Sequence, residues 1–122
     1  MSSAAMTGGR APKRKGDAFE RAVVAYLCSH GFPYVERAYG AGRPDDRGDL
    51  DGLAGFVVEV KAHRAIDLAA FIDEAVVEAR ASGAVPLVIA KRRGRPVEDA
   101  YVVLRLCDLP AVLGAVSEEE AP

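Results

Sequence analysis

Tryptophan is missing from the 122-residue sequence, cysteine occurs twice, and no apolar run approaches the roughly 18 residues that a membrane span needs. Without tryptophan, and without a row of aromatic residues on any candidate strand, a module that binds single strands by base stacking is disfavoured. Cys28 and Cys107 lie far apart among apolar neighbours, which predicts reduced core thiols and excludes a disulfide framework or a Cys/His zinc site. The N-terminal residues include no apolar stretch typical of a secretory signal, so we expect a cytoplasmic protein without membrane association.

Charge is nearly balanced overall but unevenly distributed along the chain. Lys and Arg number 16 against 18 Asp and Glu, for a net charge of −2, and half of the residues are apolar, which indicates one folded domain. The chain opens with a basic cluster free of acids and closes with an acidic run at 118–120. We therefore predict a flexible basic N-terminal arm at 1–16 that contacts phosphates, a single domain at 17–116 and an acidic tail at 117–122. The basic residues of the arm are Arg10, Lys13, Arg14 and Lys15.

Hydrophobic periodicity and local stop signals divide the domain into helices and strands. A first helix over 17–31 begins at Asp17, with Glu20 placed three residues later as in a capping box. A second helix over 67–83 has Asp67 as its N-cap. The order of helix, three strands, helix, two strands and helix predicts an α/β fold. The expected extended segments are 32–39, 49–53, 56–63, 85–90 and 101–106, with a glycine-rich loop at 40–48, a basic turn at 91–96 and a last helix at 109–116.

The strongest chemical signal is a pair of acids on consecutive strands, Asp49 and Glu59, with Lys61 two residues further on. Because side chains alternate along a strand, Glu59 and Lys61 share one face, and Asp49 lies beside Glu59 if the strands form a hairpin. Two carboxylates with an adjacent ammonium suit phosphodiester hydrolysis: the oxygens hold Mg²⁺ or Mn²⁺, and the lysine orients or deprotonates the water. For an E-x-K triplet by itself, the solvent face of an amphipathic strand is the favoured reading.

Gly48-Asp49 followed by Val58-Glu59-Val60-Lys61, with a helix before and a helix after, resembles the PD-(D/E)xK nuclease superfamily. Within it, Lys15-Gly16-Asp17-Ala18-Phe19-Glu20-Arg21, then Gly31-Phe32 and Glu36-Arg37, is similar to the archaeal-type Holliday junction resolvases and to resolvase-like proteins of actinobacterial phages. The resemblance covers about residues 13–106. It implies a restriction-endonuclease-like core, with a mixed central β-sheet flanked by helices, that cleaves DNA.

The same resemblance implies roles for particular residues. The implied catalytic residues are Glu20, Asp49, Glu59 and Lys61, and the implied metal ligands are Asp49, Glu59 and Val60. The residues implied to lie against the DNA backbone are Arg37, Arg43 and Arg47. The sequence departs from the family pattern twice: Arg47-Gly48 replaces the Pro-Asp of the family name, and Gly40-Ala41-Gly42 replaces a loop serine common in the archaeal enzymes.

Several other polar residues have two readings. Glu20 is where a capping box places an acid, so structural and catalytic roles are equally compatible with its position. His63 shares the strand face of Glu59 and Lys61 and could sit near a phosphate, although a lone histidine is more often a surface residue. Possible substitute metal ligands are Asp45, Asp46 and Asp51. The acids Asp73, Glu74 and Glu78 are expected on the solvent face of the second helix.

The basic turn at 91–96 is the densest cationic cluster outside the N-terminal arm. Its side chains cannot all be paired within the turn, so we expect phosphate contacts that are independent of sequence and sensitive to salt. A solubilising loop is the alternative. The four residues are Lys91, Arg92, Arg93 and Arg95.

Together these patterns favour a metal-dependent, structure-selective DNA endonuclease. A Holliday junction resolvase acting as a homodimer is preferred, because the two-fold symmetry of a dimer matches the paired cleavage sites of a four-way junction. Apolar residues at 85–90, 101–106 and in the last helix would supply the dimer interface. The resemblance implies cuts that leave a 5′-phosphate and a 3′-hydroxyl. A nicking, repair or restriction-type nuclease, a non-catalytic DNA-binding protein and an α/β scaffold without a nucleic-acid role remain alternatives.

Overall fold

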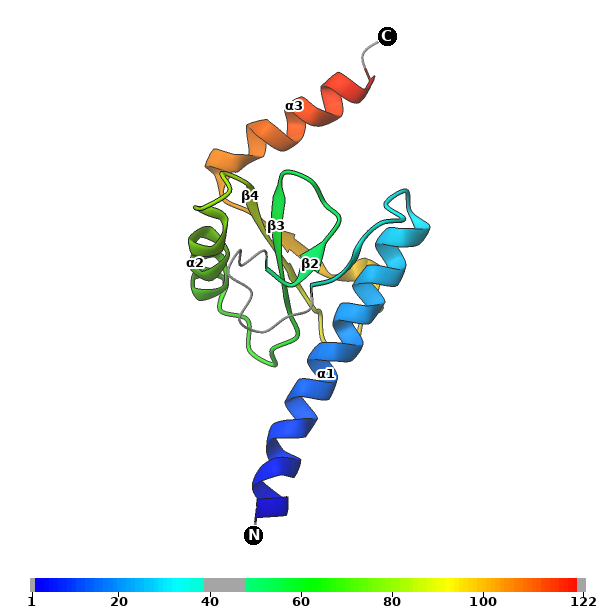
Figure 1. Cartoon of the computed structure of the whole chain (residues 1–122), viewed down its shortest axis with the longest axis vertical. Coiled ribbons are helices and arrows are strands. Elements are labelled where there is room, and N and C mark those ends of the chain that lie inside the picture. The colour runs from blue at the N-terminus through cyan, green and yellow to red at the C-terminus, as the bar shows by residue number, and fades with distance from the viewer. Residues whose placement is uncertain (1, 39–47, 121–122) are drawn as a thin grey trace.

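The computed structural model describes residues 2–38 and 48–120 and arranges them as a small sheet between two helices (Figure 1). The predicted order of helices and strands is confirmed, as is the mixed α/β architecture. The elements are α1 (Ser2–Ser29), β1 (Glu36–Arg37), β2 (Leu50–Asp51), β3 (Phe56–Lys61), α2 (Leu68–Ala79), β4 (Val85–Ala90), β5 (Tyr101–Val103) and α3 (Leu109–Glu120), with two 3₁₀ turns, η1 (Val97–Asp99) and η2 (Leu106–Asp108).

The main sheet has the strand order β3-β4-β5, with β3 and β4 parallel and β5 antiparallel to β4. The parallel pair is joined through α2, as a crossover between parallel strands requires. In register, Glu59 faces Val88 and Lys61 faces Ala90. Strands β1 and β2 form a separate antiparallel pair, in which Glu36 faces Asp51 and Arg37 faces Leu50.

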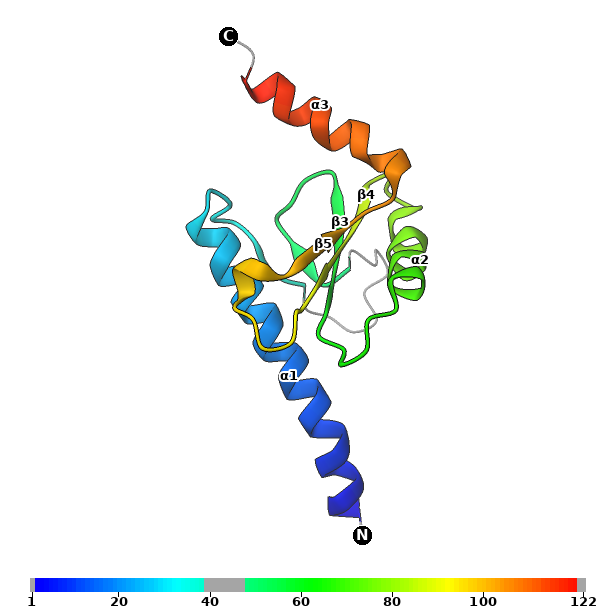
Figure 2. The ribbon, with the colours of Figure 1, turned by 180° about the vertical axis from the view of Figure 1, so that it is seen from behind.

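The two faces of the main sheet carry separate hydrophobic clusters, one under each flanking helix. Phe19 and Val23 of α1 pack with Val58 and Val60 of β3. On the opposite face, α2 packs on β4, and the buried residues there are Phe71, Ala75, Val88 and Ala90. Figures 1 and 2, taken from opposite sides, both place the sheet between α1 and α2. Since side chains alternate along β3, Glu59 and Lys61 lie on the face that α2 covers.

Helix α2 forms where the sequence predicts it, and for the predicted reasons. Asp67 is its N-cap, and the Asp67 side chain accepts a hydrogen bond from Ala70 N at 3.1 Å. Gly83 follows the helix with a φ of 68°, a left-handed conformation that glycine adopts without strain. Buried Phe71, Ala75 and Ala79 form the stripe that packs on the sheet.

The first helix is longer than predicted, because it begins at Ser2 and not at Asp17. The added turns contain alanine, methionine, lysine and arginine, which favour a helix, together with Gly8, Gly9 and Pro12, which disfavour it, so helix propensity does not account for the extension. Asp17 therefore lies within the helix, where its carboxylate pairs with Arg37 in place of capping. At the other end, α3 runs to Glu120 through part of the expected tail, which is rich in the helix former glutamate.

Two further expectations are corrected. Strand β2 pairs with β1, so β2 and β3 are not a hairpin, although Gly48 bridges to Val58 in parallel orientation. Cys28 is half-buried and Cys107 is exposed, so Cys107 is not a core thiol, although both cysteines are free. Within the described part of the chain, no helix has both the length and the apolar character needed to cross a membrane.

Candidate active site

Asp49 is fixed against the edge of β3 that faces away from β4. Asp49 N donates to Val58 O at 2.8 Å, and Asp49 Oδ2 accepts from Val60 N at 2.7 Å. On its other side, Asp49 O accepts from Ala38 N at 2.9 Å. Burial raises the pKa of Asp49, against the lowering effects of the Val60 hydrogen bond and the Lys61 charge. The Asp49 backbone is thus held on both sides, and its carboxylate is held by Val60 N, without a hairpin between β2 and β3.

Gly48 allows this close approach. Its φ is +79°, and a Cβ built there would lie 2.8 Å from Val58 O and 3.0 Å from Glu59 Oε2. The nearest atom, Val58 O, belongs to the backbone of β3 and cannot move aside as the end of a flexible side chain can. Glycine at position 48 is therefore required by the packing of Asp49 against β3.

We expect Gly48→Ala to lower the free energy of unfolding by about 2 kcal/mol or more, because left-handed strain and a steric clash add. Gly55→Ala is the matched control: Gly55 also has a positive φ, +87°, but a Cβ there would meet nothing within 4 Å. Urea denaturation followed by circular dichroism measures both variants. If both variants lost the same free energy of unfolding, the steric clash at Gly48 would contribute nothing and this prediction would be wrong.

Glu59 is buried on the face of β3 that α2 covers. The residue is only 4% exposed, and Glu59 Oε2 has no hydrogen-bond partner among the described residues. Burial, contacts with Glu78 and Glu74 and the charge of Asp49 raise the pKa of Glu59 to about 10. A carboxylate in this position is not part of a solvated strand face, so the plainer reading of the E-x-K triplet is wrong for Glu59.

Lys61 lies beside Glu59 on the same face, as the alternation predicts. Lys61 Nζ is 3.8 Å from Glu59 Oε1 and donates a hydrogen bond to Glu74 Oε2. Burial alone would lower the pKa of Lys61, but the hydrogen bond to Glu74 and the nearby carboxylate charges raise it overall. The side chain is therefore a cation at neutral pH.

Glu74 and Glu78 of α2 lie beside Glu59, and the expectation that they face solvent holds only in part, since the Glu74 side chain is 48% exposed. Both contact the Glu59 carboxylate, and Glu78 Oε2 is buried. Glu74 and Glu78 follow Phe71 by three and seven residues, a spacing that places them on the same side of the helix as Phe71. That side is the one buried against the sheet. The sequence signal was thus present, since both acids border the apolar stripe of the predicted helix.

Glu20 reaches the site from α1, and Arg37 holds it there. Arg37 Nε donates to Glu20 Oε1 at 3.0 Å, and Arg37 Nη2 donates to Asp17 Oδ1 at 2.7 Å. Burial and the charge of Asp49 raise the pKa of Glu20, while Arg37 opposes the rise. Arg37 thus links α1 to β1 through an internal ion-pair network, a role that the sequence did not indicate.

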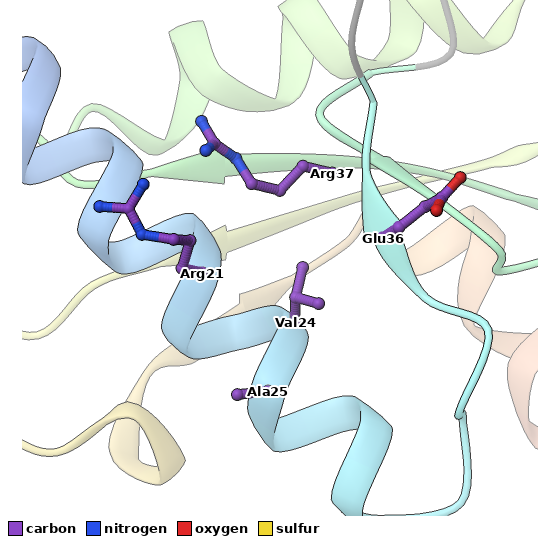
Figure 3. A pocket seen from close by; sticks show the side chains of 5 residues that line it. All are labelled: Arg21, Val24, Ala25, Glu36 and Arg37. Carbon is purple, nitrogen blue, oxygen red and sulfur yellow. The ribbon is translucent and has the colours of Figure 1, made fainter.

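Arg37 also borders a second, smaller cavity between α1 and β1. Figure 3 shows the Arg21 and Arg37 side chains extending in the same direction beside it, while Glu36 points away from Arg21. Val24 and Ala25 supply the apolar part of its lining. This cavity is separate from the acidic cleft, because none of Arg21, Glu36 and Arg37 lines the cleft.

All four predicted catalytic residues line one cleft of about 980 Å³. Two cations of the basic turn, Lys91 and Arg93, lie at the same cleft. His63 lines it too, with its ring edge-on to Phe71 at 4.9 Å between centroids. The predicted site residues that line the cleft are Glu20, Asp49, Glu59, Val60, Lys61, Lys91 and Arg93.

The other predicted residues are placed elsewhere or fall outside the described side chains. Arg92 stacks over Tyr101 at 4.9 Å, and Arg95 pairs with Asp99 at 3.5 Å. Asp51 lies on β2 and does not line the cleft. The residues whose side chains are not described are Arg10, Lys13, Arg14, Lys15, Arg43, Asp45, Asp46 and Arg47.

The donor set of the cleft fits a small, hard cation. Among the described side chains, those of residues 16–38 and 48–114, no three His, Cys, Asp or Glu converge as a ready-made metal cluster. Mg²⁺ does not need one, because it is commonly held by one or two carboxylates and keeps several waters. The unpartnered buried Glu59 Oε2 beside Asp49 is the kind of oxygen that such an ion satisfies. The Val60 carbonyl lies on the strand edge next to Asp49, since Val60 N donates to that carboxylate and both groups of a strand residue point to one side.

Comparisons with known proteins give one solved structure and no match by sequence. Neither a protein-family model nor a curated protein matches this chain. The chain is similar to the 1.6 Å structure of Hjc, a Holliday junction resolvase of the archaeal hyperthermophile Archaeoglobus fulgidus. The similarity covers 74% of this chain and 88% of that one, with 25% sequence identity and a TM-score of 0.49.

Proposed function

We propose that this protein is a divalent-metal-dependent DNA endonuclease that acts in the cytoplasm. The observation that carries the proposal is the convergence of Asp49, buried Glu59 and Lys61 in one cleft. Two carboxylates that hold a metal beside a protonated amine form a site for phosphodiester hydrolysis. Glu59 in particular is buried beside three other acids, Asp49, Glu74 and Glu78, and a bound cation would offset the repulsion among them.

The side chains divide the chemistry between them. Asp49, Glu59 and the Val60 carbonyl would hold Mg²⁺ or Mn²⁺, which when bound would offset phosphate charge and activate water. Lys61, kept protonated by Glu74, donates hydrogen bonds and stabilises negative charge as it develops on the phosphate oxygens. An ammonium in this state does not remove a proton, so of the two roles considered for Lys61 we propose the orienting and charge-stabilising one.

Lys91 and Arg93 are proposed to contact DNA phosphates at the cleft. Their positive charges would offset the repulsion between the phosphates and the acids that line the cleft. They border the same cavity as Asp49 and Lys61. Contacts of this kind bind independently of sequence and release counterions from the DNA. The basic N-terminal residues are proposed as further phosphate contacts.

We expect the double change Lys91→Ala and Arg93→Ala to weaken DNA binding and to flatten its salt dependence. Loss of two phosphate contacts reduces the slope of log K against log salt by about 1.8. Arg105→Ala is the control, because Arg105 pairs with Asp108 and does not line the cleft. Fluorescence anisotropy at several salt concentrations measures the slopes, and an unchanged slope in the double variant would remove these residues from the DNA interface.

The proposed substrate is the four-way junction, and the proposed active form is a homodimer. The sequence resemblance to archaeal-type resolvases supports the substrate, and two-fold symmetry would place one cleft at each of two opposed strands. Exposed apolar side chains on β5, η2 and α3 support the dimer, because a second copy would remove them from water. These side chains are Tyr101, Val102, Leu106 and Leu113.

Cleavage of an end-labelled four-way junction tests the proposal, with linear duplex and single strands as comparison substrates. The expected result is paired cuts on opposed strands that need Mg²⁺ or Mn²⁺, disappear in EDTA and are absent from Lys61→Ala. Nicks in linear duplex with equal efficiency would instead assign a repair or restriction-type nuclease. Junction binding without cleavage in either metal would overturn the enzymatic proposal and leave a DNA-binding protein.

A further inference from the structure

We propose that Glu74 of α2 is a positioning residue that holds the Lys61 ammonium in the cleft. This inference rests on the proposed nuclease function, because it gives Lys61 its catalytic role. The E-x-K triplet does not indicate that Glu74 contacts Lys61, because Glu74 lies 13 residues further along the chain, on α2. The contacts around Lys61 Nζ point to it.

Lys61 Nζ is surrounded chiefly by residues of α2. It donates a hydrogen bond to Glu74 Oε2 and lies 5.4 Å from the centre of the Phe71 ring. Its contact with Glu59 Oε1, at 3.8 Å, is beyond hydrogen-bond range. Glu74 is therefore the group that fixes the ammonium by a directed bond, and Phe71 adds a cation–π contact from the same helix.

Glu74 is well suited to this task because α2 is itself held firmly. The Asp67 cap begins the helix, and Phe71, Ala75 and Ala79 anchor it to the sheet. Glu74 lies three residues after Phe71, on the side of the helix that borders the cleft. Its side chain is 48% exposed, whereas that of Lys61 is 15% exposed, so Glu74 reaches inward from the mouth of the cleft.

Lysine needs such a partner more than arginine or histidine would. Its four-carbon chain has many rotamers and its ammonium has no fixed plane, so its position depends on what it bonds. Without Glu74, the contacts that remain to the ammonium among the described residues are the longer one to Glu59 and the ring of Phe71. A displacement of about 1 Å at a reacting group can reduce a rate by about 100-fold.

Steady-state cleavage by three variants tests the inference. Glu74→Ala is expected to lower kcat by about 10- to 100-fold and to change KM less than about twofold, since substrate contacts remain. Glu74→Gln keeps an acceptor of the same length and is expected to recover part of the loss. Asp73→Ala removes the same charge from the neighbouring exposed position of α2, which does not line the cleft, and is expected to match the wild type. Equal effects of Glu74→Ala and Asp73→Ala would overturn the inference.

A second readout needs no catalytic activity. Acylation of lysines by an amine-reactive ester, followed by mass spectrometry, compares Lys61 with exposed Lys91 in the same molecule at one pH. Labelling of Lys61 relative to Lys91 is expected to rise several-fold in Glu74→Ala and to stay unchanged in Asp73→Ala. Unchanged labelling in Glu74→Ala would overturn the positioning role even in an active enzyme. If the wild type cuts no DNA but the labelling rises as expected, the nuclease proposal fails while the hold of Glu74 on Lys61 stands.

Discussion

Asp49→Asn is expected to reduce DNA cleavage by about 1000-fold while leaving the fold and junction binding intact. The amide oxygen can still accept the hydrogen bond from Val60 N, so the chain keeps its place against β3. The charge that holds the metal is lost, and with it the stabilisation of negative charge in the transition state. Cleavage assays give the rate, and anisotropy with the same labelled junction gives the affinity.

Asp67→Asn is the matched control for this change. Asp67 likewise accepts a backbone N–H, from Ala70, and asparagine caps helices about as well as aspartate. Each variant therefore loses one negative charge from a side chain that accepts a backbone N–H. The difference is that Asp67 does not line the cleft. An Asp49→Asn protein that cuts within tenfold of the Asp67→Asn protein would remove Asp49 from the catalytic site.

Glu59→Gln is expected to stabilise the protein without metal and to abolish its response to metal. The pKa of Glu59 is raised in the folded protein to about 10, from an ordinary 4.5. A raised acid pKa contributes stability that is present below about pH 4.5 and is progressively lost as the pH rises toward 10. Near pH 8 the unfolded chain holds Glu59 ionised while the folded protein holds it protonated, so folding must take up a proton. Glutamine avoids that cost and is expected to raise the free energy of unfolding by about 2 kcal/mol or more.

Thermal denaturation from pH 5 to pH 9, with EDTA or with Mg²⁺, measures both effects. The wild type should lose stability with rising pH in EDTA more steeply than Glu59→Gln. Mg²⁺ should raise the wild-type Tm, since an ion that binds only the folded state stabilises it, and should leave the Glu59→Gln Tm unchanged. Glu98→Gln, an exposed position outside the cleft, controls for the change in net charge. The same Mg²⁺ response in Glu59→Gln as in the wild type would exclude Glu59 as a ligand.

Local signals predicted most of the helices and strands because their causes are local. Asp67 caps α2 through a bond within one turn, and β4 spans the predicted Val85–Ala90. Strand alternation likewise put Glu59 and Lys61 on one face. Alternation does not indicate which strand pairs with which. The hairpin considered for β2 and β3 therefore does not form, because β2 pairs with β1, although Asp49 still bonds to β3.

The parts of the site that the sequence did not predict depend on contacts between distant elements. Glu74 and Glu78 were expected on the solvent face because acids usually are exposed, but both border the apolar stripe of α2, and the packing of that helix brings them to Glu59. The bonds from Arg37 to Asp17 and Glu20 span 20 and 17 residues. No periodicity encodes such a pairing, since it arises only when β1 packs against α1.

The hydrogen bond from Ala38 N to Asp49 O ties the chain at the point where it leaves the site to the point where it returns. Residues 39–47 therefore connect two ends whose separation is already fixed by the sheet and by Gly48. Replacing that connection by one of twice the length adds only about 0.6 kcal/mol of closure entropy. The length of this connection can therefore change at little cost while Asp49, which directly precedes β2, keeps its place against β3.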